Sequence, residues 1–153
     1  MDLREKISSG LKAAMKEKDA ARLSTLRLIS AAIKDKDIAL RGQGKPEGVS
    51  ETDIMAILGK MVKQRQETAR TYEEAGRLEL AAQELAEIEV IEEYLPTPLS
   101  EDEIDAAIDD TITALEADSI RDMGRVIGAL KTRYTGRMDF GRVGPMVKDR
   151  LSA

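Results

Sequence analysis

The chain has no cysteine, no histidine and no tryptophan among its 153 residues. Without cysteine it can form neither a disulfide nor a thiolate zinc site. Without histidine it can build neither a Ser-His-Asp triad nor an imidazole metal site. These absences exclude the commonest nucleophilic and metal-dependent chemistries. Carboxylate chemistry or magnesium binding remains open but needs a cleft that the sequence does not indicate, so we expect no catalytic residue, no metal site and no cofactor.

Aromatic residues and long apolar runs are also lacking. Aromatic side chains make up only 3% of the chain, so its core must be aliphatic. No stretch approaches the roughly 18 consecutive apolar residues of a transmembrane helix. The first residues do not show a basic start followed by an apolar run. The sequence therefore predicts a cytoplasmic protein without a membrane partner.

What the sequence has instead is helical periodicity. Good helix formers dominate its composition, and Leu3, Ile7, Leu11 and Met15 repeat every four residues to give one apolar stripe. Period-two alternation of β-branched residues is missing. We predict an all-α protein with an N-terminal four-helix domain and a C-terminal three-helix bundle.

Helix starts and stops divide the chain further. A Gly- and Pro-rich loop covers residues 42–48, and Asp19 can cap the helix that precedes it. Two prolines predict a hinge at residues 96–99 between domains at 1–95 and 100–153. Gly144-Pro145 is expected to start or kink the last helix. Three capping boxes are predicted, at Ser50–Asp53, Ser100–Glu103 and Ser119–Asp122.

Charge is distributed unevenly along the chain. The net charge is −5, yet residues 97–118 carry eight acids and no base, while residues 119–153 carry eight bases and three acids. A basic segment of this kind is the usual electrostatic footprint of a polyanion partner.

The basic segment contains a helix with two unlike faces. Over residues 120–132 the apolar side chains share one side and two glycines lie on the other. Each exposed helical glycine costs about 1 kcal/mol relative to alanine, and close approach of an RNA backbone would explain both. The alternative is a solvated face whose glycines allow tight helix packing. The predicted RNA-binding residues are Arg121, Gly124, Arg125, Gly128, Lys131, Arg133, Arg137, Arg142, Lys148 and Arg150.

The N-terminal domain places charges on its apolar stripes. Arg22 and Arg65 fall on the core faces of two helices, and Glu89 and Glu92 fall on the core face of a third. Buried charges must be partnered, so we predict that Arg22 or Arg65 binds Glu89 or Glu92. The alternative is a small anion or carboxylate pocket at the two arginines.

Four segments resemble the YqeY-like proteins of the GatB/YqeY family, in the same order and over nearly the whole chain. They are Arg22–Ile29, Lys60–Arg65, Ala86–Pro96 and Asp122–Leu130. The resemblance implies two helical domains, the second similar to the tail domain of the GatB subunit of the tRNA-dependent amidotransferase. In that enzyme the tail helps to hold the tRNA while chemistry happens elsewhere.

The resemblance implies a non-catalytic protein that binds tRNA or assists tRNA-dependent amidation. Expected partners are tRNA and a tRNA-modifying or tRNA-charging enzyme, with neither DNA nor membrane. Ligase chemistry with glutamine as amido donor is not expected to carry over, because the chain has no counterpart of the kinase-like domain of GatB and resembles no glutaminase. The few aromatics favour phosphate and 2′-hydroxyl contacts to folded RNA over base stacking. The alternative function is an RNA-independent protein-interaction adaptor.

Overall fold

The computed structural model describes residues 2–152, which form helices and contain no strand. The all-α prediction is confirmed. In chain order the elements are α1 (Leu3–Glu17), α2 (Ala20–Gly42), α3 (Glu51–Glu74), α4 (Leu78–Glu92), α5 (Glu101–Ala114), the 3₁₀ helix η1 (Ile120–Asp122), α6 (Met123–Tyr134) and α7 (Phe140–Ser152). Within residues 2–152, none of these helices has the length and apolar character needed to cross a membrane.

The chain forms two compact units, with the division between Pro96 and Thr97. We call them unit 1, which holds α1–α4, and unit 2, which holds α5–α7. The division falls inside the predicted hinge at residues 96–99. Each unit has its own cluster of buried aliphatic side chains, as the composition requires.

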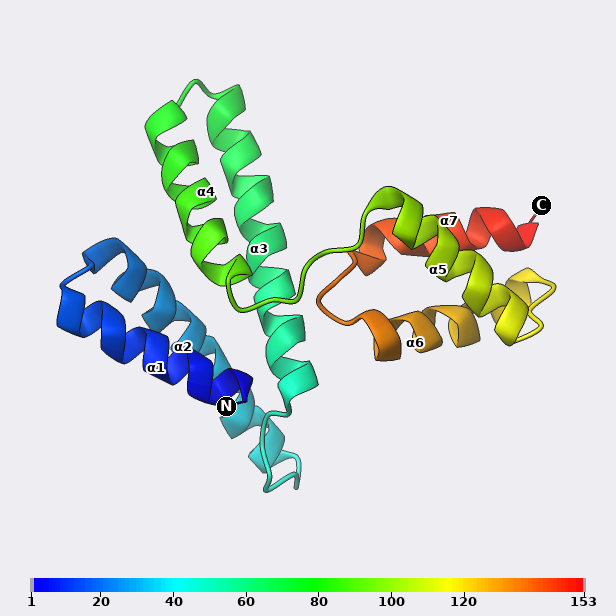
Figure 1. The fold of residues 1–153 in the computed structure, drawn as a ribbon, viewed down its shortest axis with the longest axis horizontal. Helices are drawn as coiled ribbons and strands as arrows, with labels where there is room; N and C mark the ends of the chain where they lie inside the picture. Colours follow the sequence, from blue (N-terminus) through cyan, green and yellow to red (C-terminus); the bar gives the residue numbers. More distant parts are fainter. Residues whose placement is uncertain (1, 153) are drawn as a thin grey trace. The chain divides into compact units, whose positions relative to one another are not determined.

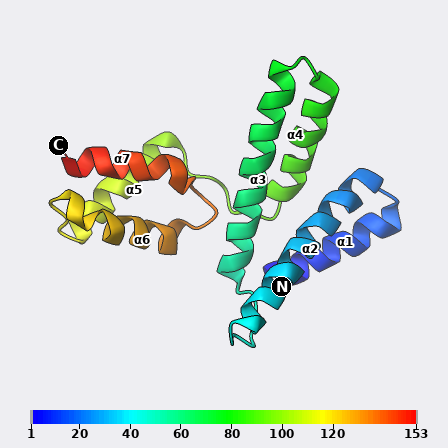
Figure 2. The same ribbon diagram turned by 180° about the vertical axis from the view of Figure 1, so that it is seen from behind.

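Unit 1 consists of two helical hairpins, α1–α2 and α3–α4 (Figure 1). The same pairing is seen from behind in Figure 2. Helix α4 packs along α3 and also contacts α2. The core is contributed by all four helices and includes Ile7, Leu26, Ile29, Leu58 and Ile91.

The predicted helix starts are correct at three of four places. Ser50 and Ser100 each accept from a backbone N–H three residues later in a complete capping box, and Asp19 accepts from the N–H of Arg22. The predicted capping box at Ser119 was wrong. Its side chain makes no cap bond, and the backbone instead turns through η1 with Asp122 N–H donating to Ser119 O. The carboxylate of Asp122 accepts from Asp118 N–H at 3.1 Å.

A buried aspartate ties three parts of unit 1 together. The carboxylate of Asp37 accepts two hydrogen bonds of 3.0 Å from the guanidinium of Arg4 and one of 2.8 Å from Val49 N–H. Gly48 has φ +72°, and a Cβ there would lie 2.5 Å from Asp37 Oδ1, so glycine is required on both counts. These three bonds lower the pKa of Asp37 to about 2. The cluster anchors α1 and the start of α3 to α2.

Unit 2 is a three-helix bundle, as predicted. Its core consists of Ile104, Ala107, Ile108, Val126, Leu130, Val143, Val147 and Leu151. Leu99 N–H donates to Arg137 O, and Arg137 Nε donates to Thr97 O, so the segment before α5 is bonded to the turn before α7. Helix α7 begins at Phe140 after Asp139, so the proline at position 145 lies inside the helix and does not start it.

Candidate nucleic-acid interface

One face of helix α6 is solvent-exposed and carries two glycines. Val126 and Leu130 are buried against α5 and α7, while Gly124 and Gly128 are exposed on the other side. A Cβ built at either glycine meets no heavy atom of the described chain within 4 Å. The alternative prediction, that these glycines permit tight helix packing, was therefore wrong within this chain. Lys131 lies three residues after Gly128 on the same helix and shares the glycine face. Arg121 lies three residues before Gly124, in η1 directly ahead of α6.

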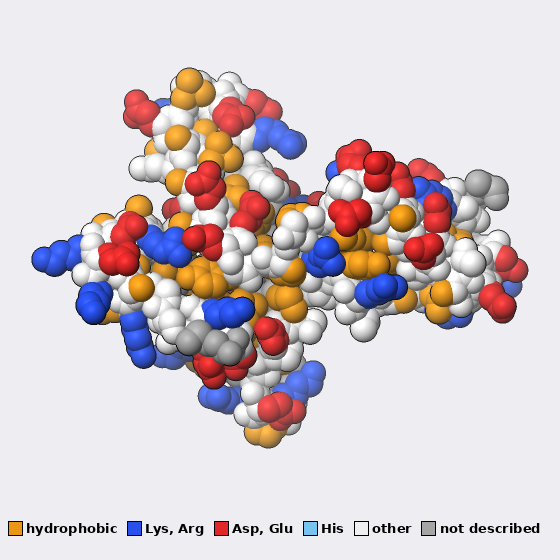
Figure 3. Space-filling model, in the orientation of Figure 1, with side chains coloured by type: hydrophobic (Ala, Val, Ile, Leu, Met, Phe, Trp, Pro, Cys, Tyr) orange, Lys and Arg blue, Asp and Glu red, His pale blue; other side chains and the backbone are white. Residues whose placement is uncertain are grey.

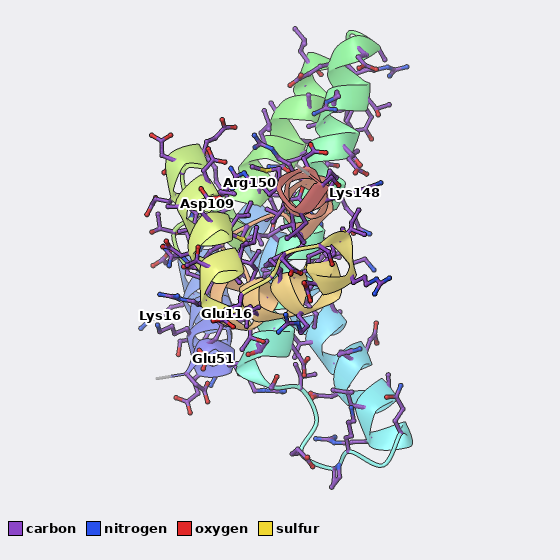
Figure 4. All side chains as sticks on the ribbon, turned by 90° about the vertical axis from the view of Figure 1, so that its right-hand side faces the viewer. Lys16, Glu51, Asp109, Glu116, Lys148 and Arg150 are labelled. Atoms are coloured by element: carbon purple, nitrogen blue, oxygen red, sulfur yellow. The ribbon has the colours of Figure 1, made fainter. Side chains whose placement is uncertain are left out.

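Two of the predicted RNA-binding arginines bind acids of α5 instead. Arg142 donates to Glu101, and Arg150 donates to Asp105 at 2.8 Å and to Asp109 at 2.6 Å. Figure 4 shows Arg150 directed toward Asp109, with Lys148 on the other side of α7. These bridges join α7 to the acidic helix.

Two further arginines are held by unit 2 itself. Arg125 donates to Asp122 at 3.0 Å and to Leu115 O at 3.3 Å. Arg137 donates to Thr97 O at 2.9 Å. Four of the eight predicted cationic residues are thus engaged within the chain. Figure 3 shows acidic side chains gathered over α5, with the basic side chains of that face lying apart from one another.

Four predicted cations make no ion pair with any residue in 2–152: Arg121, Lys131, Arg133 and Lys148. Lys131 lies 5.9 Å from the ring centroid of Phe140, and Arg133 lies 5.3 Å from that of Tyr134. Both contacts leave the positive charge uncompensated by an acid. Helical spacing puts Arg133 away from the glycine face. We define the open α6 face as Gly124, Gly128 and Lys131 of α6 together with Arg121 of the preceding η1.

The pKa shifts in unit 2 follow the bridges. The Arg142 guanidinium lowers the pKa of Glu101, and Glu101 in turn raises the pKa of Arg142. The pKa of Asp122 is lowered first by the backbone N–H of Asp118 and then by Arg125. All these groups keep their charge at neutral pH, so the bridges persist there.

In unit 1 the predicted charge pairs form with other glutamates. Arg22 binds Glu93 at 2.5 Å, which raises the pKa of Arg22, and Arg65 binds Glu87 at 3.1 Å. Glu89 and Glu92 are exposed, so the prediction that they bind these arginines was wrong.

The error has a physical cause in the orientation of α4. The predicted core face of that helix comprised Leu78, Ala81, Ala82, Leu85 and Ile88, but Leu78 and Leu85 are 68% and 46% exposed. The buried positions are Ala81, Ile88 and Ile91, so the core face is turned toward Glu87 and away from Glu89. Asp37 and Arg4 were missed altogether, although Asp37 continues the apolar stripe of Ile29 and Ile33.

The described residues hold no cluster of three or more acids that could bind a metal ion. The candidate site is the open α6 face, with two glycines and two cations that make no ion pair within residues 2–152, in an all-helical chain of two units. The chain belongs to the YqeY-like protein family, whose model matches residues 4–151.

Curated relatives are similar to this chain over part of their length. The protein called Altered inheritance of mitochondria protein 41, mitochondrial, is 32% identical over 112 residues in Lachancea thermotolerans, covering 72% of this chain and 58% of that protein. In Clavispora lusitaniae the identity is 36% over 94 residues, covering 61% and 52%. In Saccharomyces cerevisiae it is 29% over 127 residues, covering 83% and 60%. The chain thus spans little more than half the length of these relatives.

These relatives also correct one prediction. Each is named as a mitochondrial protein. The expected cytoplasmic location was therefore wrong. It rested on the first residues of the chain, and it disagrees with the mitochondrial names of these relatives.

Proposed function

We propose that this protein is a non-catalytic RNA-binding accessory of tRNA metabolism, and that the open α6 face contacts the sugar-phosphate backbone. The observation that carries the proposal is the pair of open glycines beside Arg121 and Lys131, the two cations of that face without an acid. Backbone approach to a glycine face and point charges for phosphates suit a folded RNA recognised by shape. The resemblance of residues 122–130 to the tail of GatB supports tRNA as that RNA.

The affinity should come from few phosphate contacts. Arg125, Arg137, Arg142 and Arg150 are already bonded within the chain, so recruiting them would break existing bonds. Each phosphate neutralised contributes about 0.7–0.9 to the slope of log affinity against log salt. With two phosphate contacts from the open α6 face and at most two more from Arg133 and Lys148, we expect weak binding with a shallow slope of about −1.5 to −3.5.

The test is filter binding of bulk tRNA to the full chain over a series of salt concentrations. Arg121→Ala/Lys131→Ala should weaken binding and reduce the slope by about 1.5. Arg27→Ala/Lys60→Ala, which removes the same charge from exposed positions of unit 1, is the control and should leave both values close to wild type. Equal effects of the two double variants, or a slope that neither variant changes, would contradict the proposed surface.

A second candidate is an adaptor that binds a protein without RNA. The observation that favours it is that Arg142 and Arg150 form ion pairs with acids of α5, which leaves fewer cations for an RNA. A pull-down with and without nuclease separates the candidates. Loss of a tRNA-charging or tRNA-modifying partner after nuclease treatment supports the RNA-binding function, and its retention supports the adaptor.

A further inference from the structure

Unit 1 contains a groove that the RNA-binding surface does not use. The groove lies between α2, α3 and α4 and has a volume of about 590 Å³. Leu28 comes from α2, Arg65 and Glu67 from α3, and Glu84 and Glu87 from α4. Its size falls within the range of about 300–1,000 Å³ that is typical of ligand sites.

The one cation lining the groove is already engaged. Arg65 Nε donates to Glu87 at 3.1 Å, and Arg65 Nη1 donates to the backbone carbonyl of Met61 at 3.3 Å. Glu67 and Glu84 make no ion pair with any residue between positions 2 and 152. Burial, and then the neighbouring Glu87, raise the pKa of Glu84. The groove therefore holds negative charge that the chain does not neutralise.

The sequence of α4 provides no positive charge to neutralise the glutamates of the groove. From Leu78 to Ile120 the chain has no lysine and no arginine, so the whole of α4 is acidic. This makes a nucleic acid a poor occupant, because like charges facing each other across an interface are strongly unfavourable. An occupant that brings positive charge would offset the repulsion between Glu84 and Glu87, which lie one helical turn apart.

The groove also offers an apolar contact. Leu28 lines it and remains 46% exposed, whereas most leucines of α2 and α3 are buried or partly covered. An aliphatic side chain placed on Leu28 would remove apolar surface from water, worth about 25 cal/mol per Å². Acids beside an open leucine on packed helices complement the apolar and basic faces of an amphipathic helix.

We propose that this groove docks a basic amphipathic segment of a partner protein, with an aliphatic side chain on Leu28 and a lysine or arginine at Glu67 and Glu84. The docking site is separate from the open α6 face and does not depend on RNA binding. Together the two surfaces would let the chain bring a basic protein and an RNA onto one molecule.

The experiment selects, from a phage-displayed library of random 12-residue peptides, those that bind the 153-residue chain. Glu67→Gln/Glu84→Gln serves as the counter-selection protein, because it removes two groove charges and leaves the Arg65–Glu87 bridge in place. Glu89→Gln/Glu92→Gln removes the same charge from exposed positions of α4 outside the groove and is the matched control. Circular dichroism melts establish that all variants remain folded.

We expect the enriched peptides to combine lysine or arginine with leucine-like residues. By fluorescence anisotropy they should bind the groove variant at least fivefold more weakly than wild type and the control within twofold of it. Leu28→Ser should weaken the same peptides. Enrichment of acidic or uncharged peptides, no enrichment at all, or equal losses in both charge variants would overturn the proposal. Displacement of the peptide by equimolar spermidine would also overturn it, since the groove would then be a small-cation site.

Discussion

The separation into two cores predicts that each unit melts on its own. Leu58 in α3 and Leu130 in α6 are both fully buried, each in the core of its own unit. Replacing a buried leucine by alanine costs about 2–5 kcal/mol. A folded domain has only about 0.05–0.15 kcal/mol of stability per residue. By that scale the 57 residues of unit 2 amount to about 3–9 kcal/mol and the 96 of unit 1 to about 5–14 kcal/mol.

The same substitution should therefore have unequal consequences. Leu130→Ala removes from about a fifth of the stability of unit 2 to all of it, and should lower its midpoint by about 10 °C or more. Leu58→Ala should lower only the midpoint of unit 1, by a smaller margin. Methyl-labelled methionine reports both transitions in one NMR sample, with Met61 in unit 1 and Met146 in unit 2. A control at an exposed leucine, Leu78→Ala, should move neither midpoint.

The result that would refute this reasoning is a single transition. If the Met61 and Met146 signals disappear together, and either core substitution shifts both equally, the two cores unfold as one cooperative unit. The separate clusters of buried residues would then not define separate folding units.

Three further outcomes follow from single positions. Asp37→Asn should be less stable than wild type at neutral pH. The folded pKa of Asp37 is about 2, below its ordinary 3.8, so the ionised carboxylate stabilises unit 1 above about pH 4 and this stabilisation disappears as the pH falls toward 2. Urea titrations at several pH values should show a smaller loss of stability on acidification in the variant than in wild type. Gly48→Ala should destabilise unit 1 in thermal melts, since its φ of +72° and the nearby Asp37 oxygen both oppose a side chain. Gly124→Ala and Gly128→Ala should each stabilise unit 2 by up to about 1 kcal/mol in denaturant titrations, because the added methyl meets nothing, while weakening tRNA binding.

The helices were predictable because their signals are local. The capping boxes at Ser50 and Ser100 lie within a few residues of the boundaries they set. The apolar repeat correctly predicted α1, but its last member was wrong: Met15 is 53% exposed, and Ala14 takes the buried position. The failure at Ser119 shows the limit of such signals. A Ser-x-x-Asp pattern also fits a 3₁₀ turn, and here the Ser119 hydroxyl makes no cap bond.

The partners of the arginines were not predictable in the same way. Arg142 and Arg150 meet acids that lie 41 to 45 residues earlier in the chain, and which acid faces which base depends on how α5 and α7 pack. Counting charges predicts that the segment is basic, but it does not predict which of its cations remain without an acidic partner. The Asp37 cluster did have a signal, since an acid on an apolar stripe needs a partner.

The hydrogen bonds that Arg137 makes to Thr97 and Leu99 decide where the chain can be cut. A fragment beginning at Ser100 would discard both bonds and leave Arg137 Nε and its carbonyl to water. A fragment beginning at Thr97 keeps them and retains Pro98 as a stiff lead-in to α5. A fusion protein that carries unit 2 should accordingly be linked at a position before Thr97, and the linker can be short.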